Sequence, residues 1–407
     1  MIFLFLALIT FGFSLEVSLK EAIELALKNN SELKKFESIL KARDYEEKLK
    51  LFERFSPKVE IEADKDQLQL VAQLLLLEFG RKAHAIRAEK YRKLLAEEYL
   101  REFKNLLQLE VAKLYVKLQL LEHKTQELRE RMAVAFVRFD RERQKLELGL
   151  SDPVRVAEWE KTYRSFRSQL FEAQKEYNET LYRLKRYMGI DLTKPLTLKP
   201  ISFKVDENLT LDEKKLLERL SENFKLKQKS LEVAYYEELE RGEATLFKPE
   251  VYLTGRFKYN YEGERSEDLN AILSVPIFDP TVQYRVKSIK EVKTSLLFEK
   301  EYIAQQVKER ILTFPYLWDE LIERYKFART NMNWAKINLD LQRSKYELEL
   351  AFDLGYAMAD YTQAEYELIK AETDLLLLLM EVYHTLGLEP IRALKPEREF
   401  FKERVEF

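Results

Sequence analysis

Three histidines are the only residues in this sequence that could supply an imidazole for catalysis or metal binding, and there is no cysteine. His84, His123 and His384 each lie in a stretch with strong helical character, so we interpret them as helix-face residues rather than ligands or bases. The lack of cysteine excludes disulfides, thiolate metal sites and a lipid anchor carried on cysteine. Glycine-rich phosphate loops and the HExxH motif are absent as well. The sequence therefore predicts no catalytic residue, no metal site and no cofactor. We expect a protein that is not an enzyme.

The overall composition indicates long, charged and mostly helical elements. Charged residues make up 34% of the 407 residues, yet the net charge is only −2, so there is no broad basic field for nucleic acid. Only 9 glycines and 10 prolines occur, against roughly 7% and 5% in an average protein. Few turns are available, and the segments between them must be long.

The first 14 residues, MIFLFLALITFGFS, have the length and hydrophobicity of the apolar core of a secretory signal. Gly12 and Ser14 provide a small-x-small cleavage site after Ser14, and we expect residues 1–14 to be removed on export. The alternative is a buried N-terminal strand or helix, since no Lys or Arg precedes the run. No later stretch is long and uncharged enough for a transmembrane helix, including the leucine run at 375–380.

The rest of the chain reads as two halves with one plan. The segment Ser18–Glu37 is echoed by Thr210–Ser230, each with a capping Ser or Thr followed by an amphipathic series and an Asn-containing break. We interpret residues 15–200 and 201–390 as two structural repeats and residues 391–407 as a charged C-terminal tail.

Each half contains a long segment whose apolar residues alternate in steps of four and three. Such a heptad pattern predicts helices that pack side by side as coiled coils. In the first half it runs over Leu107, Val111, Leu114, Leu118, Leu121, Thr125, Leu128, Met132, Ala135 and Phe139, and in the second over Val307, Ile311, Phe314, Trp318, Leu321, Tyr325, Ala328, Met332, Ala335 and Leu339. A continuous helix from Arg81 to about Leu148 would be about 100 Å long. Pro315 should kink its helix or mark an irregular turn.

Two shorter stretches alternate apolar and polar residues with a period of two, which predicts β-hairpins at about 57–77 and 249–278. Strands of this length can cross a bilayer, and we expect the second hairpin to face lipid through Val251, Leu253, Phe257, Tyr259, Tyr261, Leu273 and Val275. Phe278 would belong to an aromatic girdle at the other interface, while Arg256, Lys258, Asn260 and Asn270 would face water. Four strands cannot close a barrel, whereas three copies would supply twelve. The alternative is a soluble coiled-coil protein whose hairpins cover a small core.

The order of these motifs resembles that of the TolC-type outer-membrane efflux family over residues 15–390. The opening SLKEAIELALKNNSELK is similar to the N-terminal signature of that family, and SVPIFDP at Ser274–Pro280 and LLEFGRK at Leu76–Lys82 are similar to its strand-to-helix junctions. KLELGLSDPVRVAE and YELELAFDLGYAMADYTQAE resemble the two inter-helix tips, with Gly149 and Gly355 at the turns.

The resemblance implies a mostly α fold in two tandem repeats, a homotrimer with a 12-stranded outer-membrane β-barrel, and a periplasmic α-helical barrel. It implies a passive exit duct for a tripartite efflux or type I secretion system, with a periplasmic adaptor and an inner-membrane pump as partners. The runner-up is a soluble, elongated coiled-coil scaffold or adaptor with no pore. The exported cargo, whether drug, metal ion or protein, cannot be read from the residues.

The same resemblance implies roles for residues at the two tips, about 148–153 and 353–360. The adaptor would contact Leu148, Gly149, Leu150, Leu354, Gly355 and Tyr356. Asp360 would line a gate constriction, with Gln363 where many members have a second carboxylate and with Asp353 as a further contributor. Three Asp360 carboxylates in a ring would favour cations at the gate. The alternative is a solvated carboxylate near a helix start.

Overall fold

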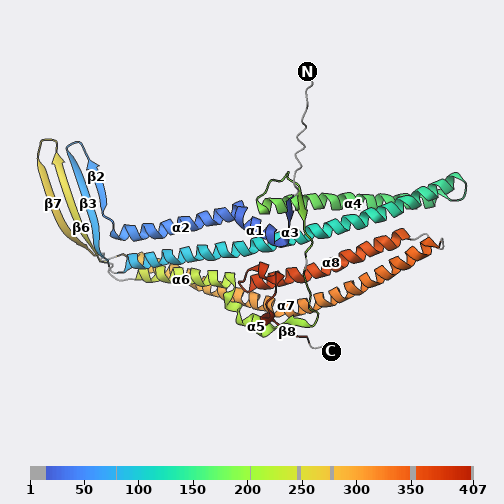
Figure 1. Ribbon diagram of the computed structural model, residues 1–407. Coiled ribbons are helices and arrows are strands. Elements are labelled where there is room, and N and C mark those ends of the chain that lie inside the picture. The colour runs from blue at the N-terminus through green and yellow to red at the C-terminus, as the bar shows by residue number, and fades with distance from the viewer. Residues whose placement is uncertain are drawn as a thin grey trace, which may run out of the picture. The chain divides into compact units, whose positions relative to one another are not determined.

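The computed structural model describes residues 15–78, 80–201, 203–244, 249–275, 279–348 and 354–404. The proposed signal segment, Phe278 and Asp353 lie outside these residues. The described chain is mostly helical (Figure 1). It divides into two compact units, one built from residues 1–31, 104–219 and 309–407 and the other from residues 32–103 and 220–308.

The two halves of the sequence present their strands and helices in the same order. The first half contains β1 (Leu15–Val17), α1 (Leu19–Asn29), α2 (Ser31–Phe55), β2 (Lys58–Ala63), β3 (Gln67–Glu78), α3 (Arg81–Glu147), α4 (Pro153–Met188) and β4 (Leu196–Leu198). The second contains β5 (Leu209–Leu211), α5 (Glu213–Glu218), η1 (Leu220–Glu222), α6 (Phe224–Ala244), β6 (Glu250–Asn260), β7 (Arg265–Ser274), α7 (Val282–Glu347), α8 (Leu354–Thr385), η2 (Pro390–Leu394), η3 (Arg398–Phe400) and β8 (Phe401–Glu403).

The long helices α3 and α7 have 67 and 66 residues, which corresponds to about 100 Å each. Most of their heptad positions are buried and the rest half-buried: Val111, Leu118 and Ala135 in α3 and Ile311 and Phe314 in α7 are fully enclosed. The helix α7 continues through Pro315 without interruption, so the expected irregular turn does not occur there. The proline costs one backbone hydrogen bond, and the neighbouring Phe314 and Trp318 are buried.

In the unit of residues 32–103 and 220–308, the four strands form one antiparallel sheet in the order β2–β3–β6–β7 (Figure 1). The two hairpins are therefore joined through β3 and β6, and β2 and β7 are left as edges. The helices of this unit follow the same lateral order. Lys93 of α3 contacts Asp44 of α2 at 2.6 Å, Gln228 of α6 contacts Glu102 of α3 at 2.7 Å, and Lys229 of α6 contacts Glu299 of α7 at 3.0 Å.

The other unit has its own lateral helix order, α4–α3–α8–α7. Leu128 of α3 packs on Leu170 and Ala173 of α4. Thr362 of α8 donates a hydrogen bond of 2.7 Å to Glu130 of α3, and Asn331 of α7 donates one of 3.0 Å to Glu367 of α8. In this unit α4 and α7 are the outermost helices.

Two small sheets complete this second unit. The parallel pair β1–β4, which we call the first clasp, closes the first half, and the antiparallel pair β5–β8, the second clasp, closes the second half. The segment that we interpret from the sequence as a charged C-terminal tail is folded up to residue 404. It forms η2, η3 and β8, and Phe400 is buried against Tyr383. The sequence pattern conceals this because charged residues surround the single buried aromatic side chain.

Candidate functional site

The four-stranded sheet has one apolar and one polar face. Residues that pair directly across antiparallel strands point to the same face, so the register assigns each face. One face carries Val59, Ile61, Ala63, Leu68, Leu70, Ala72, Leu74, Leu253, Gly255, Phe257, Tyr259, Leu269, Ala271 and Leu273. The other is mainly polar and carries Lys58, Glu60, Glu62, Gln69, Gln73, Thr254, Arg256, Lys258, Ser266, Asp268 and Asn270, together with the apolar Val71, Leu75, Tyr252 and Ile272. This separation is what a strand between lipid and water requires.

The apolar face is exposed in the single chain. Ile61 is 70% exposed, Leu269 73% and Leu273 64%, although such side chains are normally buried. A contiguous exposed apolar surface of this kind marks an interaction with another protein or with a membrane.

Most of the residues expected to face lipid lie on the apolar face of the sheet, and two of them lie just beyond the strand ends. Leu253, Phe257, Tyr259 and Leu273 lie on the apolar face, and Val251 pairs with Leu273 on that same face. Tyr261 follows the last residue of β6 and Val275 follows the last residue of β7, and both are exposed. Towards the turn, Phe257 and Tyr259 pair with Glu267 and Arg265, so the apolar surface of β7 ends before that of β6.

The two edge strands β2 and β7 have no strand partner on their outer sides in the single chain. Because each neighbouring pair in the sheet is antiparallel, β2 and β7 also run antiparallel to each other. A second copy could therefore pair its β2 with β7 and continue an all-antiparallel sheet. Unpaired edges are not tolerated in hydrocarbon, because there is no water to satisfy their N–H and C=O groups.

The outermost helices also expose large apolar side chains. In the unit that holds the sheet these are Tyr45, Leu49 and Phe52 on α2 and Tyr284, Phe298 and Tyr302 on α7. In the other unit they are Val154, Phe171 and Tyr182 on α4 and Tyr316, Phe327, Trp334, Ile337 and Leu341 on α7. Phe327, Trp334 and Leu341 recur every seven residues, which is the spacing of a coiled-coil seam without its partner.

The first tip is a tight turn between α3 and α4. Gly149 has φ +73°, a left-handed conformation that favours glycine, and the N–H of Leu150 bonds back to the carbonyl of Lys145 at 2.8 Å. Leu148 and Leu150 are 73% and 74% exposed, so this turn offers two apolar side chains to a partner.

The second tip differs from expectation. Leu354, Gly355 and Tyr356 form the first turn of α8, so Gly355 is not at a turn. A Cβ on Gly355 would lie 2.6 Å from a methyl group of Val134, so the glycine allows α8 to approach α3 closely. The error arose because a glycine that permits close helix packing and one that permits a turn look alike in a sequence.

A groove with a volume of about 410 Å³ lies beside this contact, between α3, Trp159 of α4 and Tyr356. The guanidinium of Arg138 lies 5.0 Å from the Trp159 ring and 4.3 Å from the Tyr356 ring, in cation–π contact with both. The three helices are thus joined at the tip through one arginine.

The expected gate residues join α8 to α3. Asp360 lies 3.4 Å from the guanidinium of Arg131, and the same group donates to the Gln363 side chain and to Glu127. Gln363 in turn donates to Glu367 at 3.0 Å. Arg131 could not be found from the sequence, because a charged residue on a helix pattern full of Glu and Lys gives no signal of a partner in another helix.

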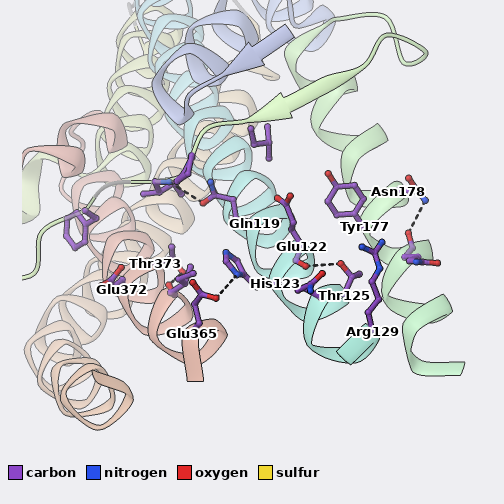
Figure 2. Close-up of a pocket in the computed structure, with 17 residues that line it drawn as sticks. Gln119, Glu122, His123, Thr125, Arg129, Tyr177, Asn178, Glu365, Glu372 and Thr373 are labelled. Carbon is purple, nitrogen blue, oxygen red and sulfur yellow. Dashed lines mark hydrogen bonds and ion pairs between the residues drawn. The ribbon is translucent and has the colours of Figure 1, made fainter. Parts of the chain in front are cut away.

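A larger cavity of about 810 Å³ lies between α3, α4, α8 and the chain after β4 (Figure 2). His123 lies 3.9 Å from Glu365 across the α3–α8 contact. The hydroxyls of Thr125 and Thr373 donate to backbone carbonyls of their own helices, so neither is paired with a base. Burial raises the pKa of Glu372. Within the described residues this cavity holds no nucleophile bonded to a base.

Among the described residues there is no group of three or more His, Cys, Asp or Glu side chains that could hold a metal ion. His84 contacts Glu238 at 2.7 Å, where Arg87 also binds, and so belongs to a structural ion-pair cluster. Within the described part of the chain, no helix has the length and hydrophobicity needed to cross a membrane.

The chain is similar in structure to several outer-membrane channels. These include VceC of Vibrio cholerae (15% identity, 91% of this chain and 96% of that one, TM-score 0.72) and the CmeC channel of Campylobacter jejuni (15%, 93% and 89%, 0.75). The open MtrE channel of Neisseria gonorrhoeae is a third (14%, 91% and 89%, 0.67). The chain has the fold of the TolC-type outer-membrane channels. No protein-family profile matches the sequence, and no curated protein matches it.

The similar structures named here are channels rather than enzymes.

Proposed function

We propose that three copies of this chain assemble in the outer membrane as a passive exit duct of a tripartite efflux or type I secretion system. Three four-stranded sheets make a barrel of twelve antiparallel strands, with the apolar face towards lipid and the polar face towards the lumen. The observation that carries the proposal is the sheet itself, which has one exposed apolar face and two free edges of opposite direction. Closure satisfies both edges at once.

The helices support the same closure. In each unit α7 is outermost on one side, and α2 or α4 is outermost on the other, and all three expose large apolar side chains. Pairing β7 with β2 of the next copy would bring α7 to the α2 of that copy and bury both apolar sets. A soluble scaffold would leave the sheet face and these seams in water.

The duct would be gated at its tips by a periplasmic adaptor and an inner-membrane pump that supplies the energy. Leu148 and Leu150 are the exposed apolar groups of the first tip, and the α8 start around Tyr356 is the neighbouring surface. We assign the gate constriction to Asp360 and Gln363, which Arg131 holds against α3.

Two measurements on the purified protein test the duct. Outer-membrane extracts should contain a trimer that dissociates on heating in detergent, and this trimer should conduct ions in a planar lipid bilayer. A monomer that stays in aqueous solution without detergent contradicts the proposal and favours the soluble scaffold.

The gate assignment has its own test. Divalent cations should lower the single-channel conductance of the native trimer, and Asp360→Ala should remove this block, because a ring of three carboxylates attracts such ions. Asp340→Ala, on α7, serves as the control and should keep the block. A block that persists in Asp360→Ala refutes the role of Asp360 as the cation site.

A further inference from the structure

The two free edges of the sheet differ in length. The edge strand β2 has 6 residues and the edge strand β7 has 10. Two copies could therefore pair these edges in several registers, and each register would offset the neighbouring sheets by a different amount. A shift of one residue would turn the apolar side chains of β2 to the polar face, so the possible registers differ by steps of two.

The apolar side chains of the two edges match in one register only. The apolar face of β2 carries Val59, Ile61 and Ala63. On the same face the first two side chains of β7 are charged and the next three are apolar: Arg265, Glu267, Leu269, Ala271 and Leu273. Antiparallel pairing of Val59 with Leu273 sets the three apolar side chains of β2 against the three of β7. A register two residues nearer the turn would place Ala63 opposite Glu267, a charge within the apolar face.

The same register also pairs the whole backbone of β2. With Val59 opposite Leu273, Lys58 lies opposite Ser274 and Ala63 opposite Leu269, so every residue of β2 faces a residue of β7. A register two residues nearer the helices would extend the pairing beyond β7 to Pro276, which has no N–H for the ladder. Backbone groups without a partner are not tolerated in hydrocarbon, which favours the register that pairs all of them.

The tilt of the strands gives an independent criterion. Within one sheet Val59 lies level with Leu269, through Ala72 and Gly255. Val59 of the next copy would lie opposite Leu273, four positions further along β7 than Leu269. Over three copies the offset reaches about twelve residues, which at 3.3 Å per residue and about 4.8 Å between strands corresponds to a tilt of about 35°. Transmembrane barrels have tilts of about 35–45°, whereas the register nearer the turn would give about 20°.

The helices attached to the two edges agree with this register. With Lys58 opposite Ser274, the end of α2 in one copy and the start of α7 in its neighbour leave the sheet at the same level. Phe52 lies in the last turn of α2 and Tyr284 in the first turn of α7, and each is 67% exposed in the single chain. Each copy therefore has an aromatic side chain at the place where the neighbouring helix would cover it.

We propose that β7 of one copy pairs with β2 of the next with Leu273 opposite Val59, and that the other pairs follow from this one. The inference rests on the proposed function and adds the register, the strand tilt and the width of the barrel. Twelve strands tilted by about 35° enclose a barrel with a backbone radius of about 11 Å.

Disulfide trapping tests the register directly, because the chain has no cysteine of its own. Residues directly opposite each other in antiparallel strands have Cα atoms about 4.5–5.5 Å apart, within the reach of a disulfide, and a shift of two residues places them beyond that reach. Val59→Cys combined with Leu273→Cys should therefore form a covalent trimer with a membrane-permeable oxidant, seen on a denaturing gel. The shifted controls combine Val59→Cys with Ala271→Cys or with Val275→Cys, and each should give at least tenfold less covalent trimer.

A second matched pair, Ala63→Cys with Leu269→Cys, repeats the test at the other end of β2 and decides the case if Val59→Cys prevents assembly. Under reducing conditions each variant should form the heat-dissociable trimer and conduct ions. A shifted pair that crosslinks as well as the matched pair overturns the proposed register, and so does a matched pair that stays uncrosslinked in a conducting trimer. The proposed function fails separately, when the native chain forms no trimer or does not conduct, whereas this inference fails with both intact.

Discussion

The first and second clasps perform the same task in the two halves with opposite strand directions. In both, the strand that opens the half pairs with a strand that comes after its last long helix, but β1 and β4 are parallel and β5 and β8 are antiparallel. In both, an aromatic side chain of the long helix also bonds to the opening strand. Tyr115 reaches the carbonyl of Val17 at 2.8 Å, and Trp318 donates to the carbonyl of Leu209 at 2.8 Å.

The two clasps differ because the chain takes different paths after the last helix of each half. In the first half the chain enters β4 soon after Gly189, whereas in the second the turns η2 and η3 intervene after Gly387 and reverse the approach. The surrounding interactions differ as well. Neutral groups hold the first clasp, such as Gln119 on the carbonyl of Lys199 at 2.7 Å, whereas Arg404 holds the second through Glu323 at 2.9 Å. The architecture of one half therefore survives a change of strand direction if the buried aromatic anchors are kept.

The largest effect should come from removing the anchor that only the second clasp has. Phe400 is 2% exposed, so Phe400→Ala should lower the free energy of unfolding by about 3–5 kcal/mol, because the substitution removes buried apolar surface and leaves a cavity. The measurement is the unfolding midpoint of the purified protein. Lys402→Ala on the exposed side of β8 is the control and should change little. Equal, small effects would mean that the second clasp does not support the helices.

A smaller effect should distinguish the turn that precedes the first clasp. Gly189 has φ +64°, and a Cβ there would lie 2.7 Å from the Cβ of Asn29, so Gly189→Ala meets both backbone strain and a clash. Gly149→Ala is the matched control, because its φ is +73° and no atom lies within 4 Å. The control should cost about 1–2 kcal/mol and Gly189→Ala more. If the two variants unfold at the same midpoint, α1 and α4 can move apart at Gly189 without a loss of stability.

The sequence predicted the regular parts of this fold and missed the parts that depend on long-range pairing. Heptad spacing identified α3 and α7, and period-two alternation identified the hairpins, because both patterns are local consequences of which side chains must be buried. The folding of the chain after residue 390 could not be predicted, since three strand residues and one phenylalanine carry no periodicity.

The candidate site likewise has features that the sequence predicted and features that it missed. The apolar face of β6 followed from alternation, and the register of the whole sheet only added its extent. Arg131 beside Asp360, and Val134 beside Gly355, required knowing which helices are neighbours.

The smallest predicted effect is a difference between the two clasps in how strongly acid loosens them. Lys326, which donates a hydrogen bond, and then Arg404 nearby lower the pKa of Glu323, so the contribution of this carboxylate to stability is present above its unfolded pKa and is lost as pH falls through the lower folded value. The anchors of the first clasp, Tyr115 and Gln119, are neutral. Hydrogen bonds from Ser18 lower the pKa of Glu21 beside this clasp, but Glu21 caps α1 and does not join the two strands, so the first clasp should respond less. Two backbone amides report the difference: Arg404 N–H bonds to Asn208 in the second clasp at 2.8 Å, and Lys199 N–H bonds to Val17 in the first at 3.0 Å. On lowering the pH below about 4, hydrogen exchange corrected for its intrinsic pH dependence should accelerate more at Arg404 than at Lys199. Because Glu323 is 60% exposed, the acceleration should be modest and should shrink further in high salt. Equal acceleration at both amides would mean that acid loosens the unit as a whole, and that the ionic anchor does not distinguish the second clasp from the first.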